Sequence, residues 1–232
     1  YTPEQREAII ATYPAHEREA RVSGTPTLGS GRIYQHTDEA VAESQIAIPA
    51  HWPRIAGMDF GWDHKTAVVW LAWDRDSDTI HLYDAYGAPE QTPMVHSLAI
   101  KARGDWIPMA WPHDGLQHEK GTGDELKKQY LKYGVKMLPK QATHAPDHTT
   151  GQKEGEGGNS VELGITELNE RILTGRFKVA KHLNDWFEEY RLYHRKDGKI
   201  VKLNDDFMDA TRYAVMMLRH AKVQAQPQRK AM

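Results

Sequence analysis

The sequence contains no cysteine among its 232 residues. This absence excludes disulfide frameworks, thiolate zinc sites and cysteine nucleophiles. It fits a reducing cytoplasm, although a cysteine-free secreted protein is not forbidden. Any metal site in this chain must therefore be built from oxygen and nitrogen ligands.

Long apolar runs and an excess of one charge are also missing. No apolar run approaches 18 residues and the first seven residues are polar, so neither a membrane span nor a signal peptide is expected. The chain has 30 Lys and Arg against 32 Asp and Glu, a formal net charge of −2. A simple nucleic-acid coat protein would be strongly basic, so any nucleic-acid contact must depend on local charge.

The pattern of turns and apolar segments predicts one large domain with an arm. Residues 1–21 look helical, whereas residues 22–50 are broken by Gly, Pro and Ser and read as an extended arm with little core of its own. We therefore expect a connector arm at 1–50, a main domain at 51–223 and a flexible tail at 224–232.

The main domain reads as an α/β fold with a mixed central sheet flanked by helices. Three apolar runs joined by two tight turns indicate an antiparallel three-strand meander, and further strands and helices follow. A long polar loop at 139–160 separates them, and Asp197-Gly198 marks a hairpin-like turn. The expected strands are 54–60, 66–73, 79–85, 106–111, 135–138 and 176–179, and the expected helices are 91–103, 123–133, 161–174, 184–194 and 205–223.

Acidic residues stand out because of their places in this pattern. Asp59 lies within the first strand, where a charge is costly unless it is paired or binds a cation. Asp114 closes the strand at 106–111, and strand ends are where sites form in α/β sheets. Asp206 and Asp209 lie three residues apart at the start of the last helix, so both carboxylates can share one face.

Structural roles remain open for two of the acids. Asp205 can simply cap the last helix, and Asp114 can be a turn residue before a glycine. Asp59 suits neither role because it lies inside a strand. Asp209 is also difficult to explain structurally, because it shares a helix face with residues that should be buried.

Carboxylates that converge from different elements suit hard cations such as magnesium and manganese. Two such ions can clamp the attacking and leaving oxygens of a phosphodiester, and no protein nucleophile is then needed. We therefore expect Asp59, Asp114 and Asp209, assisted by Asp206, to hold two Mg²⁺ or Mn²⁺ ions and to act in catalysis.

The layout resembles the ribonuclease H-like superfamily, with residues 55–61 as its opening strand and residues 205–214 as its closing helix. More narrowly, most of residues 15–220 resemble the C-terminal nuclease domain of the large terminase subunit of tailed bacteriophages. The supporting stretches are 17–34, 159–165 and 209–213. Their order and spacing together carry the resemblance.

The resemblance implies an endonuclease that cuts double-stranded viral DNA concatemers during genome packaging, with little sequence specificity. It implies partners: the protein's own N-terminal ATPase domain, a portal protein and a small terminase subunit. It also implies action in the host cytoplasm at the procapsid. The sequence has no GxxxxGK[ST] phosphate-binding loop, so we expect this chain to lack the ATPase.

Several basic and histidine side chains are candidates for DNA contact, because phosphate contacts supply most nonspecific affinity. Exposed lysines are more often simply solvated, so these remain weaker candidates than the acids. They are His64, Lys65, His113, Lys127, Lys128, Lys140, Lys153 and Arg176.

Three alternatives concern other side chains and other functions. His113, His118 and Glu119 could form a transition-metal site, but they lack helical spacing. The tryptophans are expected mostly in the core, although Trp62 and Trp111 flank the proposed site and base stacking is the alternative. The rival functions are another ribonuclease H-like enzyme, such as a junction resolvase or transposase, and a non-enzymatic module that docks on DNA or a portal.

Overall fold

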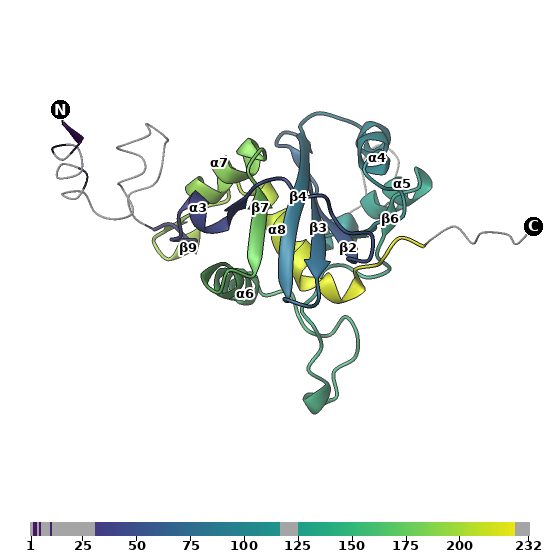
Figure 1. The fold of residues 1–232 in the computed structure, drawn as a ribbon. Coiled ribbons are helices and arrows are strands. Elements are labelled where there is room, and N and C mark those ends of the chain that lie inside the picture. Colours follow the sequence, from purple (N-terminus) through teal and green to yellow (C-terminus); the bar gives the residue numbers. More distant parts are fainter. Residues whose placement is uncertain (1, 4, 6–9, 11–30, 117–124, 226–232) are drawn as a thin grey trace, which may run out of the picture.

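The computed structural model describes residues 2, 3, 5, 10, 31–116 and 125–225. Within these residues, seven strands form one sheet in the order β1-β7-β4-β3-β2-β5-β6 (Figure 1). Strands β2 (Arg54–Asp59), β3 (Thr66–Asp74) and β4 (Thr79–Ala88) form an antiparallel meander at its centre. The predicted α/β fold with a mixed sheet built on a three-strand meander is therefore confirmed.

Shorter strands extend the meander on both sides. On one side, β5 (Pro108–Ala110) pairs in parallel with β2, and β6 (Lys136–Met137) pairs in parallel with β5. On the other side, β7 (Phe177–Ala180) pairs in parallel with β4, and β1 (Ala42–Glu43) pairs in parallel with β7. Since β2 and β5 run in the same direction, the chain segments that leave their carboxyl ends lie at the same edge of the sheet.

Helix α8 (Asp206–Met216) lies against β2 and β3, and it also contacts α6 (Val161–Leu173) and α7 (Asn184–Leu192) (Figure 1). Helices α4 (Pro93–Lys101) and α5 (Leu126–Lys132) contact each other, and α4 contacts β4. None of the described helices is long and apolar enough to cross a membrane.

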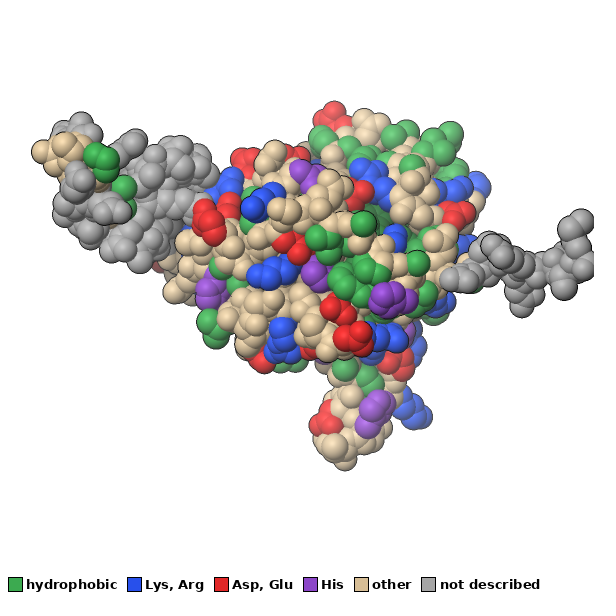
Figure 2. Space-filling view, in the orientation of Figure 1, with side chains coloured by type: hydrophobic (Ala, Val, Ile, Leu, Met, Phe, Trp, Pro, Cys, Tyr) green, Lys and Arg blue, Asp and Glu red, His purple; other side chains and the backbone are tan. Residues whose placement is uncertain are grey.

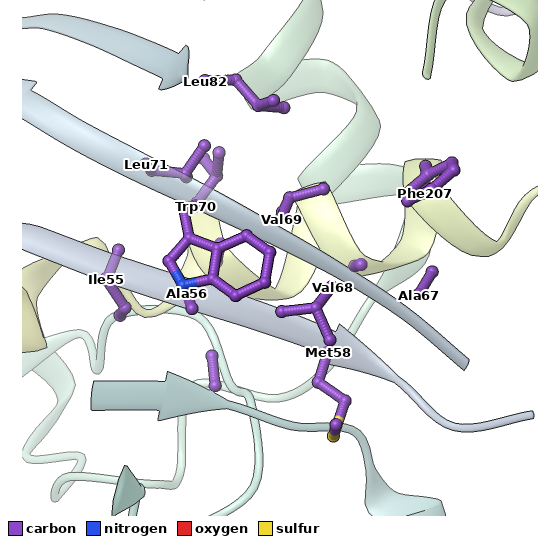
Figure 3. Packing of buried hydrophobic residues seen from close by; sticks show 14 of the residues in the cluster. Ile55, Ala56, Met58, Ala67, Val68, Val69, Trp70, Leu71, Leu82 and Phe207 are labelled. Atoms are coloured by element: carbon purple, nitrogen blue, oxygen red, sulfur yellow. The ribbon is translucent and has the colours of Figure 1, made fainter. Parts of the chain in front are cut away.

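The backbone of α8 approaches the sheet most closely at Gly57. A β-carbon at Gly57 would lie 2.1 Å from the carbonyl oxygen of Ala210 and 2.8 Å from the β-carbon of Ala214. Buried side chains of β2 and β3, together with Phe207 of α8, pack in this part of the core (Figure 3). Because side chains alternate along a strand, Asp59 faces the same side of the sheet as Gly57 and points toward the first turn of α8.

Part of the expected connector arm belongs to the domain. Tyr34 is 1% exposed, and its ring stacks on that of Tyr190 with centroids 5.6 Å apart. The short helix α3 (Asp38–Val41) leads into β1, and Val41 is fully buried. Residues 32–43 therefore contribute to the core of the domain, whereas the sequence indicated an extended arm with little core of its own. Most of the expected helix at 1–21 and most of the expected tail lie outside the described residues.

The last helix is shorter than the sequence predicts. Helix α8 ends at Met216, and a 3₁₀-helix η3 (Leu218–His220) follows instead of a continuation to residue 223. Beyond it, Lys222 exchanges two backbone hydrogen bonds with Arg54 at the start of β2, at 2.7 and 3.0 Å. These bonds require the chain to leave the helix axis, so tertiary partners end the helix before its apolar pattern ends.

The polar loop at 139–160 stands out from the body of the domain (Figure 1) and carries a 3₁₀-helix η2 (His148–Thr150). The carboxylate of Glu154 ties this loop to the segment after α8, because it accepts hydrogen bonds from Arg219 at 2.7 Å and His220 at 3.1 Å. The hydrogen bond from Arg219, assisted by that from His220, lowers the pKa of Glu154 to about 2.

Replacing Gly57 by alanine should separate α8 from the sheet. The new methyl group meets backbone and cannot be accommodated by a side-chain rotation, so we expect a loss of at least about 2 kcal/mol in the free energy of unfolding in urea. The control Gly198→Ala, where nothing lies within 4 Å and only a φ of +77° is strained, should cost about 1 kcal/mol. Equal losses in the two variants would contradict the close contact.

Replacing Glu154 by glutamine should loosen the projecting loop and leave the core intact. We expect faster backbone motion at residues 147–157 in NMR relaxation, and little change at Glu156→Gln, whose carboxylate bonds Lys153 within the loop. The pKa of Glu154 is depressed from 4.5 to about 2, so its anchoring is present above pH 4.5 and is lost as the pH falls toward 2. A loop equally ordered in both variants would contradict this anchor.

Candidate metal centre

A pocket of about 430 Å³ lies at the carboxyl end of β2, beside the first turn of α8. All four predicted catalytic carboxylates line it, although they come from three separate parts of the chain. The lining residues are Asp59, Phe60, His64, Asp114, Val161, Lys202, Leu203, Asn204, Asp205, Asp206, Asp209, Arg212 and Tyr213.

Local structure explains how each carboxylate reaches this pocket. Asp59 is the last residue of β2, and Asp206 and Asp209 share the first turn of α8. Asp114 lies in a 3₁₀-helix η1 (His113–Leu116) that follows β5, the parallel neighbour of β2. Gly115 allows η1 to pack closely against Trp111, because a β-carbon there would lie 2.5 Å from the Trp111 ring.

The two α8 carboxylates already have partners. Asp209 is 6% exposed, and its oxygens accept hydrogen bonds from Arg212 at 3.0 Å and Lys202 at 2.7 Å. Asp206 is equally buried, and Nδ1 of His64 lies 2.5 Å from its Oδ1. The contact places His64 at the site, whereas the sequence offered this residue only as a candidate for DNA contact.

The pocket holds its negative charges at a considerable electrostatic cost. Burial raises the pKa of Asp59 well above its usual range, and the charges of Asp209, Asp206 and Asp205 raise it further. Burial likewise raises the pKa of Asp205. Nearby like charges and low solvation both disfavour the carboxylate form, so this site is stabilised by any additional cation that enters it.

The donors fit a hard divalent cation in their chemistry, because they are carboxylates that converge from different elements. As the side chains stand, no three Asp, Glu or His side chains among the described residues are grouped closely enough to hold an ion. The ammonium of Lys202 instead stands between Asp205 and Asp209, at 2.9 and 2.7 Å. Asp59, Asp114, Asp206 and Asp209, which line the pocket together, are the residues that could hold a metal if their carboxylates turned toward a common point.

Another buried carboxylate, from a different helix, supports the first turn of α8, and the sequence reasoning missed it. Glu189 of α7 is 2% exposed; its Oε2 accepts the backbone N–H of Phe207 at 2.6 Å, and its Oε1 accepts a hydrogen bond from Lys65 at 2.7 Å. Burial raises the pKa of Glu189 to about 7, against the opposing effect of Lys65. Its position three residues after the buried Trp186, on the apolar face of α7, was the available signal.

The structure separates the candidates for DNA contact into several groups. His64, Lys65 and His113 lie at or beside the pocket, with His113 hydrogen-bonded to Gln141 at 2.7 Å. Arg176 lies at the opposite end of the sheet, because it directly precedes β7 and pairs with Asp78 in the β3–β4 turn at 2.7 Å. The sequence therefore grouped side chains that the fold keeps apart.

The lysine candidates lie on and around the segment after β5. Lys127 stands 4.6 Å above the Trp111 ring, Lys128 lies 3.3 Å from the Glu125 carboxylate, and Lys140 donates to the backbone of Glu154 in the projecting loop that also carries Lys153. On the face drawn in Figure 2, Lys and Arg are interspersed with Asp and Glu. This face therefore carries charges of both signs instead of a continuous basic surface.

Two further expectations concern residues around the pocket. Trp111 is buried, and its indole N–H donates to the Leu138 carbonyl at 2.7 Å, as expected for a core residue. Trp62 is 57% exposed, so the expectation that it packs in the core is wrong. It lies in the connection between β2 and β3, outside the strands of the sheet. His118 and Glu119 of the alternative metal site lie outside the described residues.

Comparison with known proteins identifies the family. The profile of the family described as the terminase RNaseH-like domain matches residues 56–218. The chain is 50% identical to the large terminase subunit of Salmonella phage P22 over 224 residues, which are 96% of this chain and 43% of that protein. It is 50% identical to the large subunit of Enterobacteria phage LP7 over 94% of this chain and 44% of that protein. The chain thus spans less than half the length of these curated relatives.

Solved structures agree with this result. The nuclease domain of the P22 large terminase superposes with a TM-score of 0.74 and 46% identity, covering 84% of this chain and 95% of that one. The nuclease domain of the bacteriophage SPP1 large terminase has a TM-score of 0.53 and 16% identity over 77% of this chain and 94% of that one, a likeness of fold. Because the family match covers most of the sequence and includes the pocket, the chain belongs to the terminase RNaseH-like domain family.

Proposed function

We propose that this domain is a metal-dependent endonuclease that cleaves double-stranded viral DNA concatemers during genome packaging. The observation that carries the proposal is the convergence of Asp59, Asp114, Asp206 and Asp209 on one pocket. Carboxylates from separate elements at a strand end are the arrangement that phosphodiester hydrolysis with divalent ions requires. Family membership favours this function over a junction resolvase or a transposase.

In this mechanism the side chains of the domain bind and orient, and none acts as a nucleophile. Two Mg²⁺ or Mn²⁺ ions, when bound, would activate a water for attack on phosphorus and stabilise the leaving 3′ oxygen. Asp59 and Asp209 reach the pocket from β2 and α8, and Asp114 and Asp206 complete the ligand set. His64, which holds Asp206 at 2.5 Å, sets the orientation of that carboxylate.

Two distant relatives support divalent ions in this role. The SPP1 nuclease domain was solved with bound Mn, and the nuclease of the thermophilic phage G20c was solved with bound cobalt at a TM-score of 0.52. Both are below 25% identity, so the choice of ion for this chain rests on its own carboxylate ligands. Oxygen ligands of this kind favour magnesium and manganese.

The substrate and partners follow from the same family. DNA would lie across the pocket with phosphate contacts from His64, Lys65 and His113, and further contacts from Lys127, Lys128, Lys140 and Lys153. Such contacts position a duplex without reading its sequence. The curated relatives are more than twice as long as this chain, so we propose that an N-terminal ATPase domain precedes it, with portal protein and small terminase subunit as partners in the host cytoplasm.

Asp59→Asn and Asp209→Asn should each reduce cleavage of supercoiled plasmid by on the order of 100-fold or more, because a metal clamp contributes several kcal/mol to the transition state. Nicking and linearisation in Mn²⁺, Mg²⁺ or EDTA would be measured beside calorimetric titration with Mn²⁺. The control Asp63→Asn removes an exposed carboxylate from the connection between β2 and β3, and Asp63 itself does not line the pocket. It should change neither the cleavage nor the Mn²⁺ binding.

Normal cleavage by a folded Asp59→Asn variant would contradict the role of that residue. Equal Mn²⁺ binding in the unmodified protein and both variants would contradict the metal site. The rival docking module predicts DNA binding in EDTA and no cleavage by either the domain or the full-length protein.

Glu189→Gln should lower cleavage by about tenfold, because the ligand-bearing turn of α8 would lose its charged support. The folded pKa of about 7 exceeds the usual 4.5, so Glu189 stabilises the folded state below pH 4.5 and this contribution is lost as the pH rises through 7. The unfolding free energy of the unmodified protein should therefore fall relative to the variant across this range. Glu188→Gln, an exposed neighbour, is the control, and identical pH profiles of unmodified and Glu189→Gln protein would contradict this role.

A further inference from the structure

Lys202 enters the pocket from the segment between the hairpin strand β9 (Lys199–Ile200) and α8. Its ammonium lies 2.7 Å from Oδ2 of Asp209 and 2.9 Å from Oδ2 of Asp205. The side chain is 58% exposed, so the charged end reaches the carboxylates while the stem remains in solvent. Such a side chain can leave the pocket without disturbing the core.

The other cation on Asp209 is held very differently. Arg212 is 3% exposed, donates to Oδ1 of Asp209 at 3.0 Å, and packs its guanidinium 4.5 Å from the Tyr213 ring. Arg212 therefore belongs to the fixed frame of the site. Lys202 contacts the other carboxylate oxygen of Asp209, Oδ2, through a side chain that is largely exposed.

We propose that the Lys202 ammonium occupies the place of one divalent cation in the metal-free site, so that Lys202 and this metal ion compete for Asp209. The inference rests on the proposed metal site and deepens it. An ion bound to Oδ2 of Asp209 at about 2.1 Å would stand within a few ångströms of an ammonium 2.7 Å from the same oxygen. Like charges at that separation repel strongly in a partly buried site, so one of the two must leave.

The backbone around Lys202 permits this exchange. Strands β8 (Arg195–Lys196) and β9 form a hairpin of two residues each, and the last bond of this hairpin is donated by Val201 to His194 at 3.0 Å. Leu203, the next residue after Lys202, is 66% exposed. Segments with few buried apolar contacts open at low free energy, so the lysine can withdraw with a local movement.

The competition accounts for two observations on the pocket. The Lys202 ammonium lies within ion-pair distance of both Asp209 and Asp205, and it supplies part of the positive charge that a metal would bring. It also holds Asp205 and Asp209 to itself, in a pocket where no three described carboxylates or histidines are grouped around a common point.

The test is calorimetric titration of Lys202→Met with Mn²⁺ in the absence of DNA. The variant keeps a long side chain and removes the competing charge, so its Mn²⁺ affinity should rise by about tenfold. Lys199→Met removes the same charge from an exposed position of the same hairpin that does not line the pocket. It should leave the Mn²⁺ affinity unchanged, which separates direct competition from a change in net charge.

Thermal unfolding gives a second, independent measure. In EDTA at low salt, Lys202→Met and Lys202→Gln should unfold at a lower temperature than the unmodified protein, because Asp205 and Asp209 lose their cation. In Mn²⁺ both variants should show a larger rise in unfolding temperature than the unmodified protein, as tighter binding requires.

The possible results distinguish this inference from the proposed function. Unchanged or weaker Mn²⁺ binding in Lys202→Met, with normal binding in the unmodified protein that Asp59→Asn abolishes, would overturn the competition and leave the nuclease site standing. Mn²⁺ binding by the variant alone would be its strongest support. Absence of binding in both proteins would overturn the competition together with the metal site.

Discussion

The contact between α8 and Gly57 is the constraint on which the rest of the domain depends. The helix backbone rests directly on β2, with room for no side chain at that point. Two residues further along the strand, the same face presents Asp59, and the helix presents Asp206 and Asp209 at its first turn. The parallel pairing of β5 with β2 then brings Asp114 to the same edge. The close approach of the α8 backbone to β2 thus helps to bring four acids that are far apart in the sequence to the wall of one pocket.

Most of the sheet and most of the pocket could be predicted from the sequence because they follow from local rules. The alternation of β2 and the spacing of Asp206 and Asp209 depend on neighbours in the chain. The contact between Glu189 and Lys65 was harder to predict, because 124 residues separate the two in the sequence and neither residue type indicates its partner. The end of α8, the burial of Tyr34 and the exposure of Trp62 have the same cause, since each depends on which distant segment covers the residue.

The carboxylates of the pocket differ in how far neighbouring cations compensate their negative charge, and this difference bears on the chemistry of the site. Asp209 has a cation on each oxygen and Asp206 has His64, whereas the pKa of Asp59 is raised by burial and by its neighbours. A fold selected for stability alone would not assemble such a group, because each buried carboxylate carries a desolvation penalty. Perturbed carboxylates in a pocket are instead typical of functional sites, and the family to which the chain belongs agrees with that interpretation.

The two outer strands of the sheet have a consequence for the behaviour of the protein in concentrated solution. Strands β1 and β6 are each only two residues long, although the meander between them is far longer. An exposed long edge offers a row of unpaired backbone groups on which another chain can add a strand, and short edges remove that template. Copies of this domain can therefore be held close together around a common axis or substrate without joining their sheets into aggregates.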